Sequence, residues 1–186
     1  MFKTTLATVP AQITYLSPGP KKQDEWRVRL GPKARERVGL VWAGNPRHRN
    51  DHNRSIPLED LSTLLGLEFE FHCLQKEIKA QDKERLSRDF LVRTHVDELK
   101  DFVDTAALIR ELDLVVTVDT SVAHLAGALG SPVWILIPFN PDFRWMTDGE
   151  SSPWYPTARL FRQSKLGDWS DVVTRVVAEL KNIPMS

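Results

Sequence analysis

Polar side chains gather where an apolar run, residues 113–119 ("DLVVTVD"), gives way to a predicted helix over 121–130. Asp119 closes the run, and Thr120 and Ser121 stand at the start of the helix. The first N–H groups of a helix have no partner inside it and lie at the positive end of its dipole. With two hydroxyl groups beside them, they predict a site that suits phosphate.

His124 lies one turn into the same predicted helix, where it can face the same crevice. A neutral imidazole there could hydrogen-bond a phosphate or sugar oxygen, and a protonated one would also offset charge on a leaving group. The alternative for each residue alone is structural, with Asp119 or Thr120 capping the helix and His124 a partly buried histidine that has a partner. Their grouping at a strand end favours a functional role.

Glycine, amide and basic side chains follow the predicted strand over 38–44 ("VGLVWAG"), in the loop "NPRHRNDHNRS". Gly44 permits a close approach of the backbone to a ligand. Asn45 and Arg54 are the loop residues that we expect to bind it, because a guanidinium can hold phosphate oxygens with a fork of donors. For any single arginine of this loop, a solvated surface charge is the alternative interpretation.

Gln75 and Lys76 end a further predicted strand, within "FHCLQKE". The lysine could neutralise a diphosphate as a point charge, and the glutamine could read the edge of a nucleobase. A solvated lysine is an equally valid interpretation. Asp104 and Thr105 begin the helix that precedes the Asp119 strand, and we expect them to cap it.

Short apolar segments alternate with helical patterns along the chain. Predicted strands cover 38–44, 69–74, 90–95, 113–119 and 132–138, and predicted helices cover 57–67, 104–112, 121–130 and 169–182, with a solvated helix or loop over 76–88. This alternation predicts the α/β class, with a single Rossmann-like domain whose mostly parallel sheet is flanked by helices. Ligands of such sheets bind outside the carboxyl ends of the strands, which is where the polar groups fall.

Size and composition narrow the class of protein. The 186 residues favour one domain, preceded over residues 1–37 by a linker or the remnant of another domain, in which 24–32 ("DEWRVRLGP") could form a short helical turn. The 25 basic and 25 acidic residues cancel, so neither nucleic acid nor an anionic membrane is expected as a partner. The single cysteine excludes an internal disulfide, and no apolar run is long enough for a signal peptide or a membrane span. We therefore expect a cytoplasmic protein.

Several common chemistries find no support in the motifs. Neither the glycine pattern of dinucleotide-binding proteins nor that of the P-loop is present. Ser121 and His124 are close together on one helix and lack the glycines of a nucleophile elbow, which argues against a serine hydrolase. No histidine spacing indicates a metal site.

Four segments together resemble a known family: "VGLVWAGNPRHRNDHNRSIPL", "FHCLQKE", "DFVDTAALIRELDLVVTVDTSVAHLAGALGSPVWILIPF" and "DGESSPWYPTARLFRQ". They resemble the C-terminal domain of bacterial tetratricopeptide-repeat glycosyltransferases. These are related to glycosyltransferase family 9, the heptosyltransferases, and more distantly to protein O-GlcNAc transferases. The resemblance covers roughly residue 38 to the C-terminus, and "VDTSVAHLAGALG" is a specific part of it.

The resemblance implies a GT-B architecture, in which two Rossmann-like domains face each other and the C-terminal one, here residues 38–186, binds the nucleotide-sugar donor. The donor diphosphate is then expected at the helix that starts near Thr120 and Ser121, with His124 assisting as the catalytic residue. No metal or other cofactor is expected, because helix starts and basic side chains stabilise the departing nucleotide diphosphate. The residues expected to bind the nucleotide diphosphate are Gly44, Asn45, Arg54, Gln75, Lys76, Asp119, Thr120, Ser121, His124 and Arg144.

The acceptor-binding domain of this family and its repeats do not appear in the sequence, so a separate acceptor-binding domain or chain is an expected partner and independent activity stays open. The alternative function is a non-catalytic binding or interaction domain that kept the fold. Self-association is a third hypothesis, in which exposed Trp145, Trp154 and Tyr155 cover the face that the other domain would bury. Ordinary packing of these aromatic residues under the loop is the interpretation that we favour.

Overall fold

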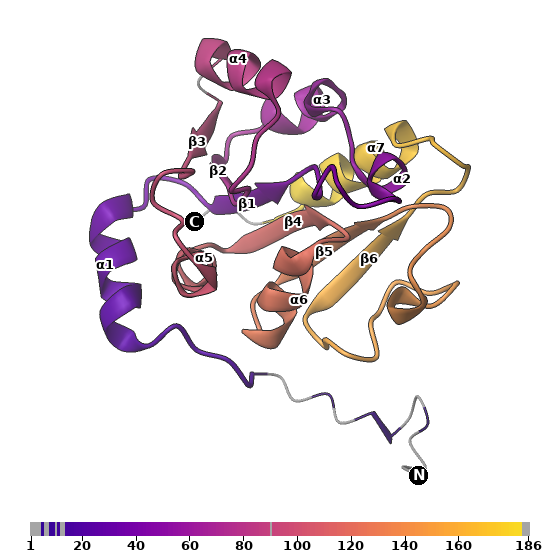
Figure 1. Ribbon diagram of the computed structural model, residues 1–186, viewed down its shortest axis with the longest axis horizontal. Helices are drawn as coiled ribbons and strands as arrows, with labels where there is room; N and C mark the ends of the chain where they lie inside the picture. The colour runs from indigo at the N-terminus through magenta and orange to yellow at the C-terminus, as the bar shows by residue number, and fades with distance from the viewer. Residues whose placement is uncertain (1–4, 6–7, 10, 12–13, 90, 184–186) are drawn as a thin grey trace.

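Six parallel strands form one sheet in the order β3-β2-β1-β4-β5-β6 (Figure 1). This computed structural model describes residues 5, 8, 9, 11, 14–89 and 91–183. The strands are β1 (Arg37–Val41), β2 (Glu70–Cys73), β3 (Val92–Thr94), β4 (Leu114–Val118), β5 (Val133–Ile137) and β6 (Ala158–Arg162). The predicted α/β class is confirmed, and every named strand pair of the sheet is parallel.

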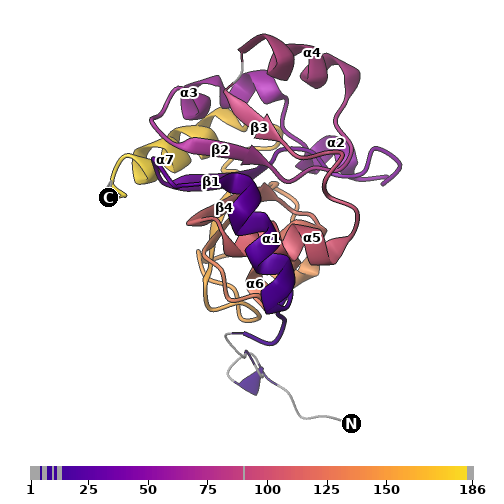
Figure 2. The same ribbon diagram turned by 90° about the vertical axis from the view of Figure 1, so that its left-hand side faces the viewer.

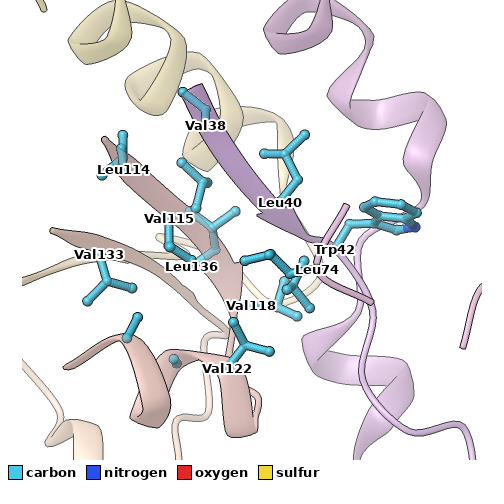
Figure 3. Packing of buried hydrophobic residues seen from close by; sticks show 14 of the residues in the cluster. Val38, Leu40, Trp42, Leu74, Leu114, Val115, Val118, Val122, Val133 and Leu136 are labelled. Carbon is cyan, nitrogen blue, oxygen red and sulfur yellow. The ribbon is translucent and has the colours of Figure 1, made fainter. Parts of the chain in front are cut away.

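The central strands are short apolar runs because helices cover both of their faces. Every residue of β1 and β4 is buried. Figure 3 shows Val38 and Leu40 of β1 beside Val115 and Val118 of β4, within one cluster of buried side chains. A continuous β-branched or aliphatic run therefore formed a strand at each of these predicted positions.

The helices lie in two layers, one on each side of the sheet. They are α1 (Pro20–Leu30), α2 (Asp51–Arg54), α3 (Ser62–Leu65), α4 (Ala80–Asp89), α5 (Phe102–Arg110), α6 (Ser121–Ala128) and α7 (Ser170–Leu180), with single turns of 3-10 helix at η2 (Leu58–Leu61) and η3 (Phe143–Trp145). Helices α5 and α6 cover one face, and α3, α4 and α7 cover the other (Figures 1 and 2). Helix α1 packs against α5.

The predicted helix over 57–67 is in fact a 3-10 turn followed by one turn of α-helix, η2 and α3. Leu58, Leu61 and Leu64 are spaced by three residues, which matches the three-residue period of a 3-10 helix. All three side chains are buried, so the apolar face was predicted correctly although the helix type was not.

Helix α1 belongs to the segment that the sequence marks as a linker or remnant, residues 1–37. It is longer than the predicted turn, and its Trp26 is 1% exposed. The Trp26 indole donates to Asp104 Oδ1 at 3.3 Å, and Lys22 Nζ lies 2.9 Å from the same oxygen. The end of this segment is thus part of the folded core.

Helix α5 is capped by Asp101 rather than by the predicted Asp104. Asp101 Oδ1 accepts hydrogen bonds from the N–H groups of Val103 at 2.8 Å and Asp104 at 3.0 Å. Asp104 sits one turn further in, where its carboxylate binds α1 instead. The first residue of the apolar pattern is therefore not the first residue of the helix.

The long connection between β5 and β6 returns along the outer side of β6. Ser151 forms an isolated antiparallel bridge with Arg159, and the N–H of Leu160 donates to the carbonyl of Glu150 at 2.8 Å. Trp145, which the self-association hypothesis takes as exposed, is fully buried in this connection, and Trp154 is 36% exposed. The Trp145 ring packs on His124 of helix α6, which confirms for Trp145 the ordinary packing that we favoured over an exposed aromatic face.

In the part of the chain that the structure describes, no helix has both the length and the apolar character needed to cross a membrane.

Trp26→Ala is expected to destabilise the fold by about 3–5 kcal/mol, because it removes a large buried side chain and leaves Asp104 without its indole partner. Val28, on the same helix, is 82% exposed, so Val28→Ala is the matched control and should change stability by less than about 0.5 kcal/mol. Urea unfolding followed by circular dichroism measures both. Equal, small effects would mean that α1 is a dispensable linker.

Two histidines stack in the core between β2 and the end of β3. Nδ1 of His72 lies 3.0 Å from Nε2 of His95, and the rings stack at 5.3 Å. Burial, with the adjacent His95, lowers the pKa of His72 to about 4. Burial also lowers the pKa of His95, and the nearby Glu98 carboxylate opposes this. The fold therefore holds both imidazoles neutral.

This pair predicts a loss of stability in acid. An unfolded histidine takes up a proton near pH 6.5, whereas folded His72 does not until about pH 4, so the unfolded state binds more protons in between. Stability should be constant above about pH 6.5 and fall as the pH drops towards 4, by about 1.4 kcal/mol for each unit of pKa difference. His72→Phe should flatten this dependence of the unfolding free energy on pH, and His52→Gln, at an exposed site, should not. An unchanged slope in His72→Phe would contradict the assignment.

Candidate functional site

A cleft of about 550 Å³ opens at the carboxyl ends of β1, β2 and β4. Strand β1 connects to β2 on one side, whereas β4 connects to β5 on the other, so the two connections diverge from neighbouring strands. Such a switch point is the usual ligand site of an open parallel sheet. The cleft is lined by Val41, Ala43, Gly44, Asn45, Arg54, Leu74, Gln75, Lys76, Glu77, Lys100, Asp101, Phe102, Thr105, Thr120, Ser121 and Val122.

The structure brings seven of the ten predicted ligand-binding residues together in this cleft. They are Gly44, Asn45, Arg54, Gln75, Lys76, Thr120 and Ser121. Asp119, His124 and Arg144 do not line it. The backbone carbonyl of Asp119 accepts a hydrogen bond from Arg54 at the wall of the cleft. His124 lies further along α6, and Arg144 belongs to η3.

Arg54 joins the ends of β1 and β4. Its Nη1 donates to the carbonyl of Asp119 at 2.9 Å, and its Nε lies 3.3 Å from Oδ1 of the buried Asp51. Gly44 packs against this pair so closely that a Cβ atom there would lie 2.5 Å from Asp51 Oδ1 and 2.7 Å from Arg54 Nη2. The glycine therefore makes room for the guanidinium, which stands at the wall of the cleft.

Gln75 orders the mouth of the cleft. Its Oε1 accepts from the N–H groups of Trp42 at 2.8 Å and Ala43 at 3.0 Å, and its Nε2 donates to the carbonyl of Glu77 at 3.3 Å. The amide thus ties the end of β1 to the end of β2. Lys76 is exposed and its Nζ donates to the carbonyl of Lys100 at 2.6 Å, across the opening.

Helix α6 begins at the cleft without a side-chain cap. Thr120 occupies the N-cap position, but its Oγ1 lies 3.2 Å from Thr117 Oγ1 instead of accepting from the helix. The N–H of Ala123 turns back to the carbonyl of Thr120 at 3.1 Å. The N–H groups of Ser121 and Val122 have no acceptor among the described residues, and both residues line the cleft. An anion would find two free donors here.

His124 is held by aromatic side chains beyond the first turn of α6. Its Nδ1 lies 2.9 Å from Tyr155 Oη, and its ring stacks on Trp145 with centroids 5.0 Å apart. Burial lowers the pKa of His124, while the carboxylate of Asp119 raises it and Arg144 lowers it further. The imidazole is therefore neutral near pH 7.

Arg162 forms hydrogen bonds with the backbone of the loop that carries Trp145. Its guanidinium donates to the carbonyls of Trp145, of Met146 at 3.1 Å, of Asp148 at 3.0 Å and of Gly149 at 2.7 Å. Met146 adopts a left-handed conformation with φ of 57°, which is uncommon outside glycine. Fixing these carbonyls fixes the indole that packs on the histidine.

Arg144 lies at the surface of this loop. Its Nε is 2.9 Å from Asp142 Oδ1, and its guanidinium stands over the Phe143 ring at 5.2 Å. It is close enough to influence the pKa of His124 but does not reach the cleft.

The start of α5 supplies lining residues that the sequence reasoning missed. Lys100, Phe102 and Thr105 belong to this wall, and Phe102 is 60% exposed. The predicted strand over 90–95 could have indicated them, because the residues that follow its carboxyl end must lie at the same edge of the sheet as the other strand ends. The cations Arg54, Lys76 and Lys100 stand in the cleft with the carboxylates of Glu77 and Asp101, and Arg54 is paired with the buried Asp51 behind the wall.

The described residues contain no group of three or more His, Cys, Asp or Glu side chains that could hold a metal ion. The chemistry that the cleft can perform with its own groups is anion binding, through the free N–H groups of α6 and the surrounding cations.

A family model and one curated relative match this sequence. Residues 73–137, from the end of β2 to the end of β5, match the profile of glycosyltransferase family 9 (heptosyltransferase). Protein FlbA of Caulobacter vibrioides is 28% identical over 195 aligned residues, which cover 99% of this chain and 32% of FlbA. The chain therefore spans about a third of the length of this curated relative.

Solved structures show the same fold. The E. coli ADP-heptose lps heptosyltransferase II matches with a TM-score of 0.57 at 19% identity, over 95% of this chain and 55% of the other. The E. coli heptosyltransferase WaaC, with ADP-2-deoxy-2-fluoro heptose, matches with a TM-score of 0.54 at 18% identity, over 85% and 47%. A family 9 glycosyl transferase from Veillonella parvula gives 0.54 at 13% identity, over 84% and 44%. The chain thus has the α/β fold of one half of these transferases, and residues 73–137 carry the sequence pattern of glycosyltransferase family 9.

Proposed function

We propose that the chain is the donor-binding half of a metal-independent glycosyltransferase, and that the cleft holds the nucleotide diphosphate of a nucleotide sugar. One observation carries the proposal: the uncapped start of α6 and the cations Arg54, Lys76 and Lys100 meet in one cleft at the switch point of the sheet. A diphosphate has the charge and the acceptor oxygens that these groups can bind. The family match over 73–137 supports the same class of donor.

In the proposed glycosyl transfer, negative charge develops on the departing diphosphate, which the cleft can stabilise. An acceptor hydroxyl attacks the anomeric carbon of the sugar, a new C–O bond forms, and the bond from that carbon to the diphosphate oxygen breaks. The electron pair leaves with the nucleotide diphosphate, and the helix start, Arg54 and Lys76 stabilise the charge. His124 does not line the cleft, so its proposed assistance as a neutral hydrogen-bond partner requires a leaving group that extends past Ser121 to the imidazole. The hydroxyl proton passes to a base that we assign to the acceptor side.

The acceptor side, in this proposal, is a second Rossmann-like domain facing the cleft as in GT-B enzymes, in the same protein with tetratricopeptide repeats or in a separate chain. A non-catalytic domain, the alternative function, would still bind the donor in the cleft but would not transfer the sugar.

Isothermal titration with UDP, ADP, GDP and their sugar conjugates, first without metal and then with magnesium, tests the donor site. Saturable binding without metal supports the proposal, and no binding to any of them would refute it. Transfer measured with a separately supplied acceptor half then distinguishes enzyme from binding module.

Thr120→Asp is expected to weaken nucleotide-diphosphate binding by at least about tenfold, because it places a carboxylate beside the diphosphate. Aspartate is a favourable N-cap residue, so the helix should be as stable as before. Thr120→Asn, also a favourable N-cap but uncharged, is the matched control and should bind within about threefold of the original. Calorimetric titration and a thermal melt measure both properties. Undiminished binding by Thr120→Asp would move the diphosphate away from α6.

Gly44→Ala is expected to reduce affinity for the nucleotide diphosphate by about tenfold, since the added Cβ must push the Arg54 guanidinium away from the cleft wall. Gly66→Ala is the control, because the nearest atoms to a Cβ there lie 3.7 Å away. Both variants can be titrated under the same conditions. If Gly44→Ala binds normally, Arg54 does not contact the ligand.

A further inference from the structure

Tyr155 belongs to the connection between β5 and β6, and its side chain packs against the face of helix α6 that carries His124. Its ring packs directly on Gly127, where a Cβ atom would overlap Cγ of the tyrosine. Positions 124 and 127 are neighbours on the helix surface. Helix α6 therefore fixes the tyrosine with one residue and presents the histidine to it with another, and Oη comes within 2.9 Å of Nδ1.

The imidazole is held on its other side by Trp145. The two rings are stacked with an angle of 19° between their planes, and Trp145 is fully buried. Arg162 fixes the backbone of that tryptophan through the carbonyls at the end of the loop. The histidine ring is thus confined between an indole and the edge of a phenol, and Nδ1 keeps its partner.

Both partners of this hydrogen bond are neutral near pH 7. Burial raises the pKa of Tyr155 to about 12, with the phenol of Tyr15 adding to the effect. Burial lowers the pKa of His124, against which Asp119 and Asp142 act, while Arg144 lowers it further. One proton lies between phenol oxygen and imidazole nitrogen.

The proton belongs to the phenol. A neutral phenol is a stronger acid than a neutral imidazole N–H, and the unprotonated ring nitrogen is a stronger acceptor than a phenol oxygen. These acidities favour a bond in which the Tyr155 hydroxyl donates to Nδ1 and accepts from the phenol of Tyr15. In a neutral imidazole with Nδ1 as acceptor, Nε2 carries the hydrogen.

We propose that Tyr155 is a positioning residue, which donates a hydrogen bond to Nδ1 of His124 and thereby holds the imidazole as the Nε2–H tautomer. The Nε2 edge of the ring then carries an N–H donor, which meets an oxygen of the leaving diphosphate where the ligand extends past the cleft lining to His124. The role towards the diphosphate rests on the proposed function, whereas the tautomer is a property of the unliganded protein. Among the described residues Nε2 has no hydrogen-bond partner, so it is the ring nitrogen available to a ligand.

The tautomer can be measured by correlating ring nitrogens and hydrogens of ¹⁵N-histidine-labelled protein by NMR, with His124→Gln identifying the signal among the five histidines. The original chain is expected to show protonated Nε2 and unprotonated Nδ1. Tyr155→Phe keeps the ring on Gly127 and removes the hydroxyl, so a population with protonated Nδ1 should appear. The pKa of His124 should also rise towards its ordinary value, because the lost bond favoured the neutral form.

The chain has two tyrosines, and Tyr15→Phe is the comparison variant, since it removes the phenol that hydrogen-bonds Tyr155 and keeps the bond between Tyr155 and the histidine. It should leave the tautomer unchanged. Protonated Nδ1 in the original chain, or an identical tautomer in Tyr155→Phe, would overturn the inference.

A binding measurement separates the inference from the proposed function. Tyr155→Phe is expected to bind nucleotide diphosphate roughly three- to tenfold more weakly, the range for one hydrogen bond, and Tyr15→Phe to bind normally. Equal affinity of Tyr155→Phe and the original chain would overturn the role towards the diphosphate. If the original chain binds no nucleotide, the proposed function fails, and the NMR result still decides whether Tyr155 sets the tautomer.

Discussion

The divergence of β1 and β4 is the constraint on which the cleft depends. The two strands are paired in register, with Val41 opposite Thr117. Gly44 and Thr120 each come three residues after that pair, so the two residues lie at the same distance beyond the carboxyl ends of the strands. A switch in direction between adjacent strands thus opens the cleft and brings polar residues distant in sequence to its walls.

Divergence has a cost, because backbone groups at the strand ends lose their ladder partners. The amide of Gln75 replaces those partners for the N–H groups of Trp42 and Ala43. Arg54 does the same for the carbonyl of Asp119. Side chains that look like ligand-binding groups therefore also keep the strand ends apart in a defined geometry, and the Oε1 atom of Gln75 serves this purpose in the unliganded protein.

Strands β1, β4 and β5 could be predicted because they are short apolar runs, and their carboxyl ends must meet because the strands are parallel. Strand β6 was not predicted, because arginines interrupt its apolar residues. The meeting of the carboxyl ends also placed Gly44, Lys76 and Thr120 in one cleft. It could not place His124, because sequence spacing gives the helix face but not the partner that comes from a distant connection. The packing of Trp145 under the loop was predicted, but its contact with His124 of α6 was not, because that contact joins segments distant in the sequence.

Helix α1 was predicted only in part, as a short turn over 24–32, because its sequence is strongly polar and only Trp26 and Leu30 are buried. A helix that packs through two side chains leaves no periodic apolar pattern. Its attachment comes instead from Asp104, which receives the indole of Trp26 and the ammonium group of Lys22. Such contacts between elements are a property of the tertiary structure.

The connection that returns along β6 has a consequence for the surface of the protein. An open strand edge exposes unpaired N–H and carbonyl groups to which another chain can add a strand. The bridge between Ser151 and Arg159 and the bond from Leu160 to Glu150 occupy part of that edge. The other edge strand, β3, is three residues long. The loop that holds the aromatic side chains against α6 thus also makes the sheet a poor template for aggregation.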